Sequence, residues 1–329
     1  TLYLYYSYFS YLLFNLSYIY HMENSILEAI NINKFYGKHQ ALNNISISIP
    51  KGSIYGILGP NGAGKTSFIR ILNQIIYPDS GTILFDGELL QQKHISQIGY
   101  LPEERGLYKS MKVGEQLLYL SQLKGLSKEQ AKQQINFWFE RLEIPNWKEK
   151  KIQELSKGMA QKIQFVATVI HKPKLLIFDE VFSGLDPINA EVIREQIIYL
   201  KEQGATILFS THRMESVEEM CDYITLIHKS NKILDGKLVD IKKKYRTNEY
   251  QIGIIPFQPN ILEVLSEQFE VSETNFQSIY NEIKITIKKK EDKTINELIQ
   301  YLLTQGEITH FSEIIPSVND IFIQMVKDN

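Results

Sequence analysis

The fold is decided by one stretch of sequence, Gly59-Pro60-Asn61-Gly62-Ala63-Gly64-Lys65-Thr66-Ser67. A short apolar run, Ile54–Leu58, precedes it and predicts a strand buried on both faces, and residues 67–74 predict a helix. Glycines let the backbone curl so that successive N–H groups point inward, and the start of a helix adds partial positive charge. Together with the ammonium group of Lys65, this arrangement predicts an anion site.

The spacing matches the P-loop pattern G-x-x-x-x-G-K-[ST], so the predicted ligand is ATP. The Lys65 side chain is expected to neutralise the β- and γ-phosphates, and the Thr66 hydroxyl to ligate Mg²⁺. A glycine-rich turn that matches by chance is the alternative, and the flanking strand and helix argue against it. The residues expected to hold the nucleotide are Gly59, Asn61, Gly62, Ala63, Gly64, Lys65, Thr66 and Ser67.

A second motif is an apolar run that ends in two acids, Leu175-Leu176-Ile177-Phe178-Asp179-Glu180. Such a run places carboxylates at the carboxyl edge of a parallel sheet, where α/β proteins bind ligands. We expect Asp179 to hold Mg²⁺ through water and Glu180 to polarise the attacking water, because phosphoryl transfer depends mostly on positioning and charge stabilisation. Alone, this motif is as often structural as functional; the P-loop upstream favours function.

Between these motifs lies Leu155-Ser156-Lys157-Gly158-Met159, just before a helical run at residues 160–170. It resembles the ABC signature, usually Leu-Ser-Gly-Gly-Gln, although alone it would be an ordinary helix N-cap. The resemblance implies an ABC ATPase, in which this site caps the γ-phosphate held by a second subunit. Ser156 and Gly158 are then the main contacts, and two copies of the chain pair head to tail around two ATP molecules.

Four further matches support this family. Tyr36 resembles the aromatic residue that stacks on adenine, although such a residue by itself is more often a packed strand residue. The run Ser183-Gly184-Leu185-Asp186 resembles the loop that crosses between subunits, and His212 resembles the switch histidine that senses the γ-phosphate. Tyr100-Leu101-Pro102-Glu103 aligns with the loop that links nucleotide to the transmembrane partner. The resemblance makes Lys65, Glu180 and His212 the expected catalytic residues, with Asp186 at the nucleotide.

The last of these matches departs from the family, whose loop normally ends in glutamine. Glu103 offers an anionic carboxylate instead, which is a good hard ligand for Mg²⁺. We therefore expect Glu103 to share the metal with Thr66 and Asp179. The Cys and His residues show no metal-ligand spacing that would indicate another metal site.

The predicted fold class is α/β: a P-loop NTPase of the ABC type at residues 23–240, with an inserted helical subdomain at about 113–170. A basic run, Lys242-Lys243-Lys244-Tyr245-Arg246, is interpreted as a solvated linker at 241–249. Beyond it, alternating strands and helices at 250–329 indicate a small α+β accessory domain. Their order suggests a ferredoxin-like sandwich. Residues 1–22 differ from the rest because they are rich in tyrosine.

That first stretch leaves three interpretations open: an extension outside the natural product, a tail, or a membrane segment. Residues 1–20 contain no charged side chain, but they lack the basic region and cleavage site of a signal peptide. The formal net charge of −2 gives no indication of a nucleic-acid partner. A single cysteine, Cys221, excludes internal disulfides and fits a reducing compartment such as the cytosol.

Residues 100–113 and the signature variant resemble the sodium-exporter-type branch of ABC ATPases, whose C-terminal domain has a closing element similar to residues 315–322. The resemblance implies an ATP-hydrolysing subunit on the cytoplasmic face of the membrane, with separate integral membrane permease subunits as partners. A soluble ABC ATPase acting on the ribosome or DNA is one alternative, although those types carry two cassettes or a long coiled coil. A module that binds ATP without turnover is the other, and Glu180 and His212 argue against it.

Overall fold

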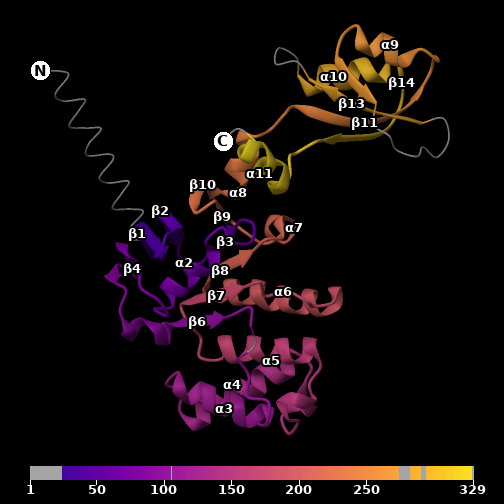
Figure 1. The fold of residues 1–329 in the computed structure, drawn as a ribbon. Helices are drawn as coiled ribbons and strands as arrows, with labels where there is room; N and C mark the ends of the chain where they lie inside the picture. Colours follow the sequence, from indigo (N-terminus) through magenta and orange to yellow (C-terminus); the bar gives the residue numbers. More distant parts are fainter. Residues whose placement is uncertain (1–23, 105, 274–281, 290–293, 328–329) are drawn as a thin grey trace, which may run out of the picture. The chain divides into compact units, whose positions relative to one another are not determined.

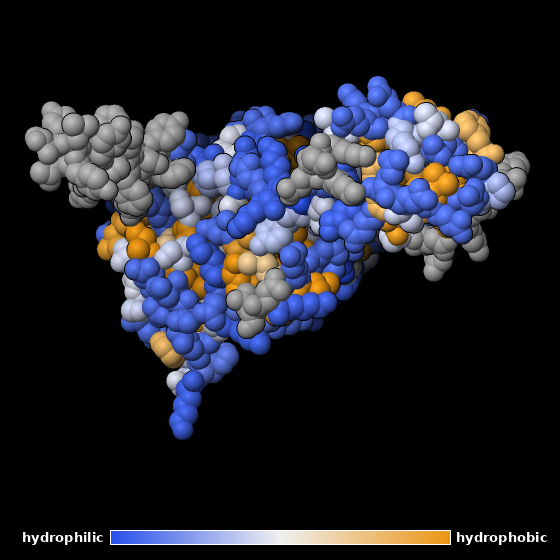
Figure 2. Space-filling view, turned by 90° about the horizontal axis from the view of Figure 1, so that it is seen from above, coloured by the Kyte–Doolittle hydropathy of each residue, from blue (hydrophilic) through white to orange (hydrophobic). Residues whose placement is uncertain are grey.

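The computed structural model describes residues 24–104, 106–273, 282–289 and 294–327. The tyrosine-rich stretch predicted as an extension lies outside these residues. The chain divides into two compact units, Thr1–Leu238 and Val239–Asn329 (Figure 1). On the face seen in Figure 2, hydrophilic residues predominate and hydrophobic residues form separate patches. Within the described ranges, no helix has the length and apolar character needed to cross a membrane.

A six-stranded sheet organises the first unit, in the order β10-β9-β3-β8-β7-β6. Its strands pair in parallel except for the antiparallel edge strand β10. The central strands β3, β7 and β8 are buried at every position, which is why they read as continuous apolar runs rather than alternating ones. The strands are β3 (Ile54–Leu58), β6 (Ile98–Leu101), β7 (Leu175–Asp179), β8 (Thr206–Thr211), β9 (Tyr223–His228) and β10 (Asn231–Lys237).

An antiparallel sheet, β2-β1-β4-β5, shares one hydrophobic core with this parallel sheet. Helix α2 (Lys65–Leu72) contributes Phe68 and Leu72, both fully buried, to the same core. β1 and β2 form a hairpin that continues to the two-residue turn at Gly37, whose φ is +60°. The strands are β1 (Ser25–Tyr36), β2 (His39–Pro50), β4 (Ser80–Phe85) and β5 (Glu88–Leu89).

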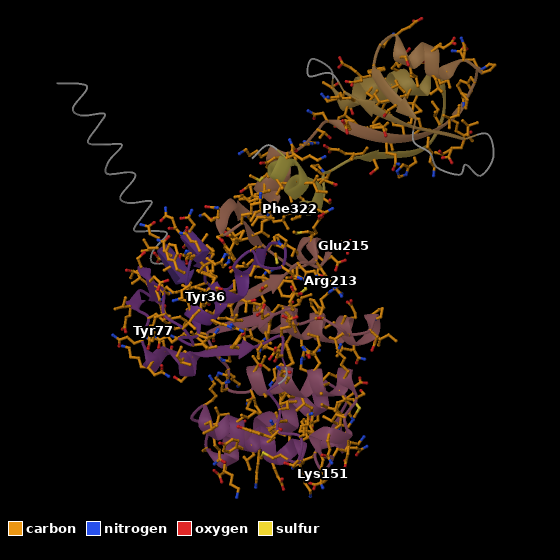
Figure 3. The ribbon with its side chains drawn as sticks, viewed as in Figure 1. Tyr36, Tyr77, Lys151, Arg213, Glu215 and Phe322 are labelled. Atoms are coloured by element: carbon orange, nitrogen blue, oxygen red, sulfur yellow. The ribbon has the colours of Figure 1, made fainter. Side chains whose placement is uncertain are left out.

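The predicted helical block forms α3, α4 and α5, with short 3₁₀ turns between α4 and α5 at Pro145 and Ile152. Trp138 on α4 packs edge-on against Phe165 on α5, with ring centroids 5.9 Å apart, and Phe165 stacks on Phe178 of β7. These rings anchor the helical block to the sheet. Figure 3 shows that Lys151, in this block, lies far from Tyr36 of the β1–β2 hairpin. The helical elements are η1 (Gln92–Gln97), α3 (Val113–Leu123), α4 (Lys128–Arg141), η2 (Pro145–Trp147), η3 (Ile152–Glu154), α5 (Lys157–Val169), α6 (Pro187–Glu202) and α7 (Met214–Glu218).

The second unit has the element order β-α-β-β-α-β and the sheet order β12-β13-β11-β14, with antiparallel neighbours throughout. This is the ferredoxin-like arrangement that the sequence suggested. Helices α9 and α10 supply Ile261, Leu265, Leu298 and Leu302 to its core. The elements are β11 (Glu249–Pro256), α9 (Ile261–Ser266), β12 (Glu270–Glu273), β13 (Ile283–Lys288), α10 (Ile295–Leu303), β14 (Gly306–Glu313) and α11 (Val318–Lys327).

The basic run interpreted as a linker differs from that expectation. Helix α8 (Leu238–Lys244) includes its first three lysines. Leu238 and Ile241 are both buried, and their spacing of three residues is that of one helical face, so the segment folds as a helix with its lysines at the end. Lysines in the last turn of a helix also interact favourably with its dipole.

Candidate active site

The glycine-rich loop joins β3 to α2, and close packing requires glycine at two of its positions. Gly59 has a φ of +151° and Gly64 a φ of +114°, and a Cβ atom at either would collide with a backbone carbonyl oxygen, of Ile227 and Ala41 respectively. Gly64 is the N-cap of α2, whose first turn carries no acidic residue. The loop therefore brings backbone N–H groups and an uncompensated helix start to one place.

A pocket lies above this loop, and among the described residues that line it Lys65 is the only lysine or arginine. Its side chain is 7% exposed, and Nζ donates to the carbonyl oxygens of Gly59 (2.6 Å) and Pro60 (3.2 Å). Burial lowers the pKa of Lys65, and the carboxylates of Glu180, Asp179 and Glu103 oppose that shift. The lysine thus faces three acids across a confined space. Its ammonium group is held in place by two carbonyl oxygens, so it is preorganised to bind an additional anion.

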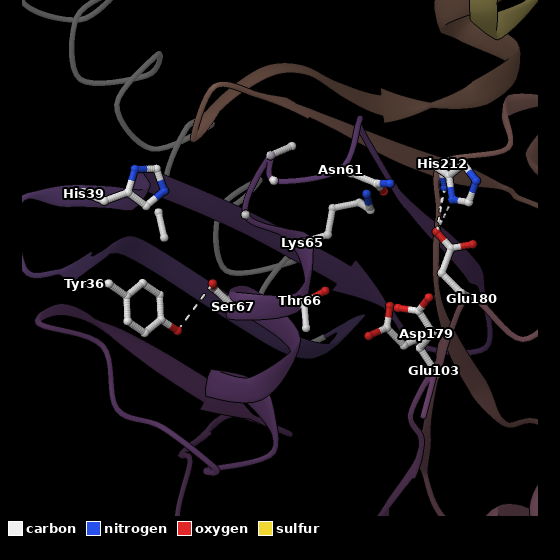
Figure 4. A pocket seen from close by; sticks show the side chains of 14 residues that line it. Tyr36, His39, Asn61, Lys65, Thr66, Ser67, Glu103, Asp179, Glu180 and His212 are labelled. Carbon is white, nitrogen blue, oxygen red and sulfur yellow. Dashed lines mark hydrogen bonds and ion pairs between the residues drawn. The ribbon is translucent and has the colours of Figure 1, made fainter. Parts of the chain in front are cut away.

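The pocket has a volume of about 250 Å³ and brings together most of the predicted site residues (Figure 4). Only Gly59 of the predicted phosphate-loop residues is absent from its lining. The lining residues are Tyr36, His39, Ala41, Asn61, Gly62, Ala63, Gly64, Lys65, Thr66, Ser67, Glu103, Asp179, Glu180 and His212. Five segments of chain converge here: four follow or end the strands β3, β6, β7 and β8, which all end at the same edge of the sheet, and the fifth is the β1–β2 hairpin.

Asp179, Glu103 and Thr66 present oxygen atoms to this pocket, as a hard cation requires. Asp179 is 3% exposed, and burial raises its pKa, an effect to which the nearby Glu180 and Glu103 add. In the described part of the chain, no three His, Cys, Asp or Glu residues form a metal cage by themselves. Mg²⁺ is commonly held by one or two carboxylates together with water and substrate phosphates.

Glu180 occupies a left-handed backbone conformation, with φ of +53°. For a residue with a side chain this conformation costs on the order of 1 kcal/mol, so the surrounding contacts must hold it. Its Oε1 accepts hydrogen bonds from the backbone N–H of His212 (2.9 Å) and lies 2.7 Å from Nδ1 of the same residue, while Oε2 accepts one from Thr211 Oγ1 (3.3 Å). The carboxylate is therefore fixed at the end of β7, paired with the histidine that follows β8.

Tyr36 and His39 form the side of the pocket farthest from the carboxylates (Figure 4). They are cross-strand partners at the tip of the β1–β2 hairpin, so their side chains share a face. The Tyr36 ring is 45% exposed, unlike a packed strand residue, and its hydroxyl donates to Ser67 Oγ at 3.4 Å. His39 and Ala41 also line the pocket, and the sequence analysis did not predict them. Their position on β2, the strand that pairs with the one carrying Tyr36, was the available signal.

Ser156, Gly158 and Asp186 do not line this pocket and instead form a second cluster where α5 and α6 begin. Ser156 Oγ accepts from the backbone N–H of Met159, and Asp186 accepts from the backbone N–H and the Nδ2 of Asn189. A Cβ atom at Gly158 would lie only 3.2 Å from Asn189 Nδ2, so the two helix starts are in contact. The predicted site residues are thus divided between two places in one chain.

The helices of both clusters share a further property. Among the α-helices whose first turn is described, only α2, α5 and α6 lack an acidic residue there. An acid in the first turn compensates the positive end of the helix dipole, so its omission leaves that end of α2 and α5 available to an external anion, whereas the N-cap carboxylate of Asp186 occupies the start of α6. The other helices carry, in order, Glu115, Glu129, Glu215, Asp240, Glu263, Glu297 and Asp320.

Comparison with known proteins agrees with this geometry. Residues 42–183 match the family model described as ABC transporter, and residues 236–326 match that of the ATP-binding protein DrrA1-3-like C-terminal domain. The chain is 38% identical over 296 residues to an uncharacterized ABC transporter ATP-binding protein, YhaQ, of Bacillus subtilis, covering 90% of this chain and 97% of that protein. It therefore belongs to the ABC transporter ATP-binding proteins.

Two further similarities bear on the fold and the branch. A lantibiotic transport ATP-binding protein, SrtF, of Streptococcus pyogenes is 34% identical over 224 residues, covering 68% of this chain and 93% of that protein. A solved structure of an ATP-binding subunit of an ABC transporter has a TM-score of 0.63 at 28% identity, covering 67% of this chain and 93% of that one. The predicted family, its C-terminal accessory domain and the fold class are confirmed.

Proposed function

We propose that this protein is the ATP-hydrolysing subunit of a membrane exporter, that two copies work head to tail, and that they drive separate permease subunits from the cytoplasmic face of the membrane. Family membership supports ATP binding and hydrolysis. Similarity to a lantibiotic transport protein and to the DrrA1-3-like C-terminal domain supports the exporter assignment.

In the proposed site, the loop amides and Lys65 bind the triphosphate, and Tyr36 stacks on the base. Thr66, Asp179 and Glu103 are the residues that would hold Mg²⁺, which when bound would offset the charge of the phosphates. Glu180 accepts a hydrogen bond from the attacking water, and His212, held by the same carboxylate, contributes a donor toward the γ-phosphate. Burial of Lys65 and Asp179 strengthens their electrostatic contacts relative to water.

One observation carries the proposal of a pair: Ser156, Gly158 and Asp186 lie outside the pocket that holds all the other predicted residues but Gly59. The first turn of α5 carries no acid, and Ser156, Lys157 and Asp186 at the two helix starts are exposed. If a second copy presents these helix starts to the nucleotide of the first, each ATP is enclosed from both sides. ATP then favours the paired state because it binds that state more tightly, and hydrolysis reverses the preference.

The test is the molar mass of the Glu180→Gln variant in solution. The variant keeps the shape of the side chain but accepts protons poorly, so we expect turnover to fall by about 100-fold or more. In light scattering with Mg-ATP its mass should double, and with Mg-ADP it should not. Glu215→Gln, which neutralises an exposed glutamate in α7, is the matched control and should resemble the wild type. A Glu180→Gln protein that remains a single copy with saturating ATP would contradict the proposal.

A further inference from the structure

Helix α5 carries two buried glutamines, Gln161 and Gln164, each 5% exposed. At a spacing of three residues they lie on the same face of the helix. The Gln161 amide donates to the carbonyl oxygen of Val181, the residue directly after Glu180, at 3.2 Å. The Gln164 amide donates to the carbonyl oxygens of Pro102 and Glu104, each at 3.3 Å. One side chain thus holds the backbone on both sides of Glu103.

The chemistry of the amide suits this double contact. A side-chain NH₂ group has two hydrogens and can donate to two carbonyl oxygens at once, whereas the amide oxygen would be repelled by both. The Oε1 of Gln164 is buried, and within the described residues it has no hydrogen-bond partner. A buried acceptor without a partner is unfavourable. In the part of the chain that the structure describes, the side chain thus leaves its own oxygen without a partner in order to donate two bonds to this loop.

From this geometry we infer that Gln164 is a positioning residue that fixes the Glu103 carboxylate in the nucleotide pocket. The inference rests on the proposed function, because it concerns the metal-holding role of Glu103. Glu103 lies in a short loop after β6, and the Gln164 amide binds this loop to α5. Without the tether, the loop has other conformations available and the carboxylate spends less time beside Thr66 and Asp179.

The tether has a consequence for the working pair. Helix α5 begins at Ser156, in the cluster proposed to meet the nucleotide of the second copy. The same rigid helix holds Glu103 through Gln164 and the segment after Glu180 through Gln161. A shift of α5 when the copies pair would move the carboxylates of Glu103 and Glu180 in the chain's own pocket. Gln164 therefore connects the two nucleotide sites through contiguous contacts.

The first experiment needs no nucleotide. Hydrogen–deuterium exchange is measured in peptides covering 100–104, in the wild type, in Gln164→Met and in Gln161→Met. Methionine keeps the length of the side chain and removes the donors. We expect about tenfold faster exchange in Gln164→Met, which is the effect of losing one or two net hydrogen bonds. Gln161→Met is the matched control, since it removes an equally buried amide from the same helix, and exchange at 100–104 should remain as in the wild type.

The second experiment measures binding of a fluorescent ATP analogue as Mg²⁺ is varied. We expect Gln164→Met to raise the half-saturating Mg²⁺ concentration by about tenfold, as loss of a residue supporting a metal ligand does. Glu103→Gln should give a similar rise, and the double variant no more than either, because both changes act on one contact. Gln161→Met should leave the Mg²⁺ midpoint unchanged.

The outcomes separate the two claims. Unchanged exchange and an unchanged Mg²⁺ midpoint in Gln164→Met overturn the inference, as do equal shifts in Gln161→Met. If the wild type binds no nucleotide, the proposed function fails, while the exchange experiment still decides whether Gln164 holds the loop. Should Gln164→Met not fold, Gln164→Asn keeps the amide but is too short to reach both carbonyl oxygens, and the same two shifts are expected.

Discussion

Helices α2 and α5 begin in the same way and in different surroundings. Both lack an acid in the first turn, and each has a lysine as its first residue, Lys65 and Lys157. Lys65 is buried, donates two hydrogen bonds and faces three carboxylates. Lys157 is exposed and lies over Gly184, and the nearest carboxylate of the cluster, Asp186, is already engaged by Asn189. One helix start is enclosed by its own chain and the other is open.

From this contrast we expect one chain to supply two kinds of phosphate contact. An enclosed helix start with a buried lysine binds an anion without help, because desolvation strengthens its contacts. An open start contributes little by itself in water, and becomes effective only when another surface covers it. The comparison therefore predicts that damage to α2 removes binding, while damage to α5 removes only what requires the second copy.

The largest effect is expected at the enclosed helix. Lys65→Ala removes a buried cation from the pocket and leaves the phosphates facing three carboxylates, so ATP affinity should fall by about 100-fold, equivalent to about 3 kcal/mol. Titration with a fluorescent nucleotide measures it. Lys128→Ala, which removes the exposed first residue of α4, is the matched control and should bind as the wild type does. An unchanged titration in Lys65→Ala would show that Lys65 and the start of α2 do not bind the phosphates.

At the open helix, Ser156→Ala should lower turnover by about tenfold or more while ATP binding to the single chain stays within about twofold. Loss of the N-cap also destabilises the fold by about 1 kcal/mol. Ser127→Ala makes the same change at the N-cap of α4, where Ser127 accepts from the Gln130 N–H, and so controls for that loss. If phosphate release is equally affected in both variants, the signature serine is merely a cap.

The smallest effect is expected at Lys157, the first residue of α5. Lys157→Glu places an acid in the first turn of α5, which should stabilise the isolated chain by about 0.5 kcal/mol in thermal unfolding. The same carboxylate repels a phosphate, so turnover should fall severalfold. Lys157→Gln separates the loss of the lysine from the gain of an acid. Wild-type turnover in Lys157→Glu would show that no anion approaches this helix start.

The contiguous motifs of the site were predictable from sequence because their neighbours in the chain fix their geometry. The phosphate loop lies between a strand and a helix, and Asp179 and Glu180 end a strand, so local pattern places them at one sheet edge. His39 was missed because nothing in its own sequence neighbourhood indicates chemistry; only its pairing with Tyr36 across the hairpin brings it to the pocket.

Gln161 and Gln164 illustrate the other limit. On a helix, glutamines are ordinarily exposed, and their positions on α5 differ from those of solvent-facing residues only through tertiary packing. The backbone carbonyls they bind lie in loops 20 and about 60 residues distant in sequence, which no local pattern connects. The basic run at 242–246 misled in the opposite sense, since its charge suggested a linker while Leu238 and Ile241 supplied a helical face.

The left-handed backbone at Glu180 has an evolutionary consequence. Glycine or asparagine adopts that conformation at little cost, so either would relieve strain at the end of β7. A screen that rewards heat resistance alone would then drift toward replacing the very side chain proposed to polarise the attacking water. Improvement of this protein for durability should hold residue 180 fixed and seek its gains elsewhere.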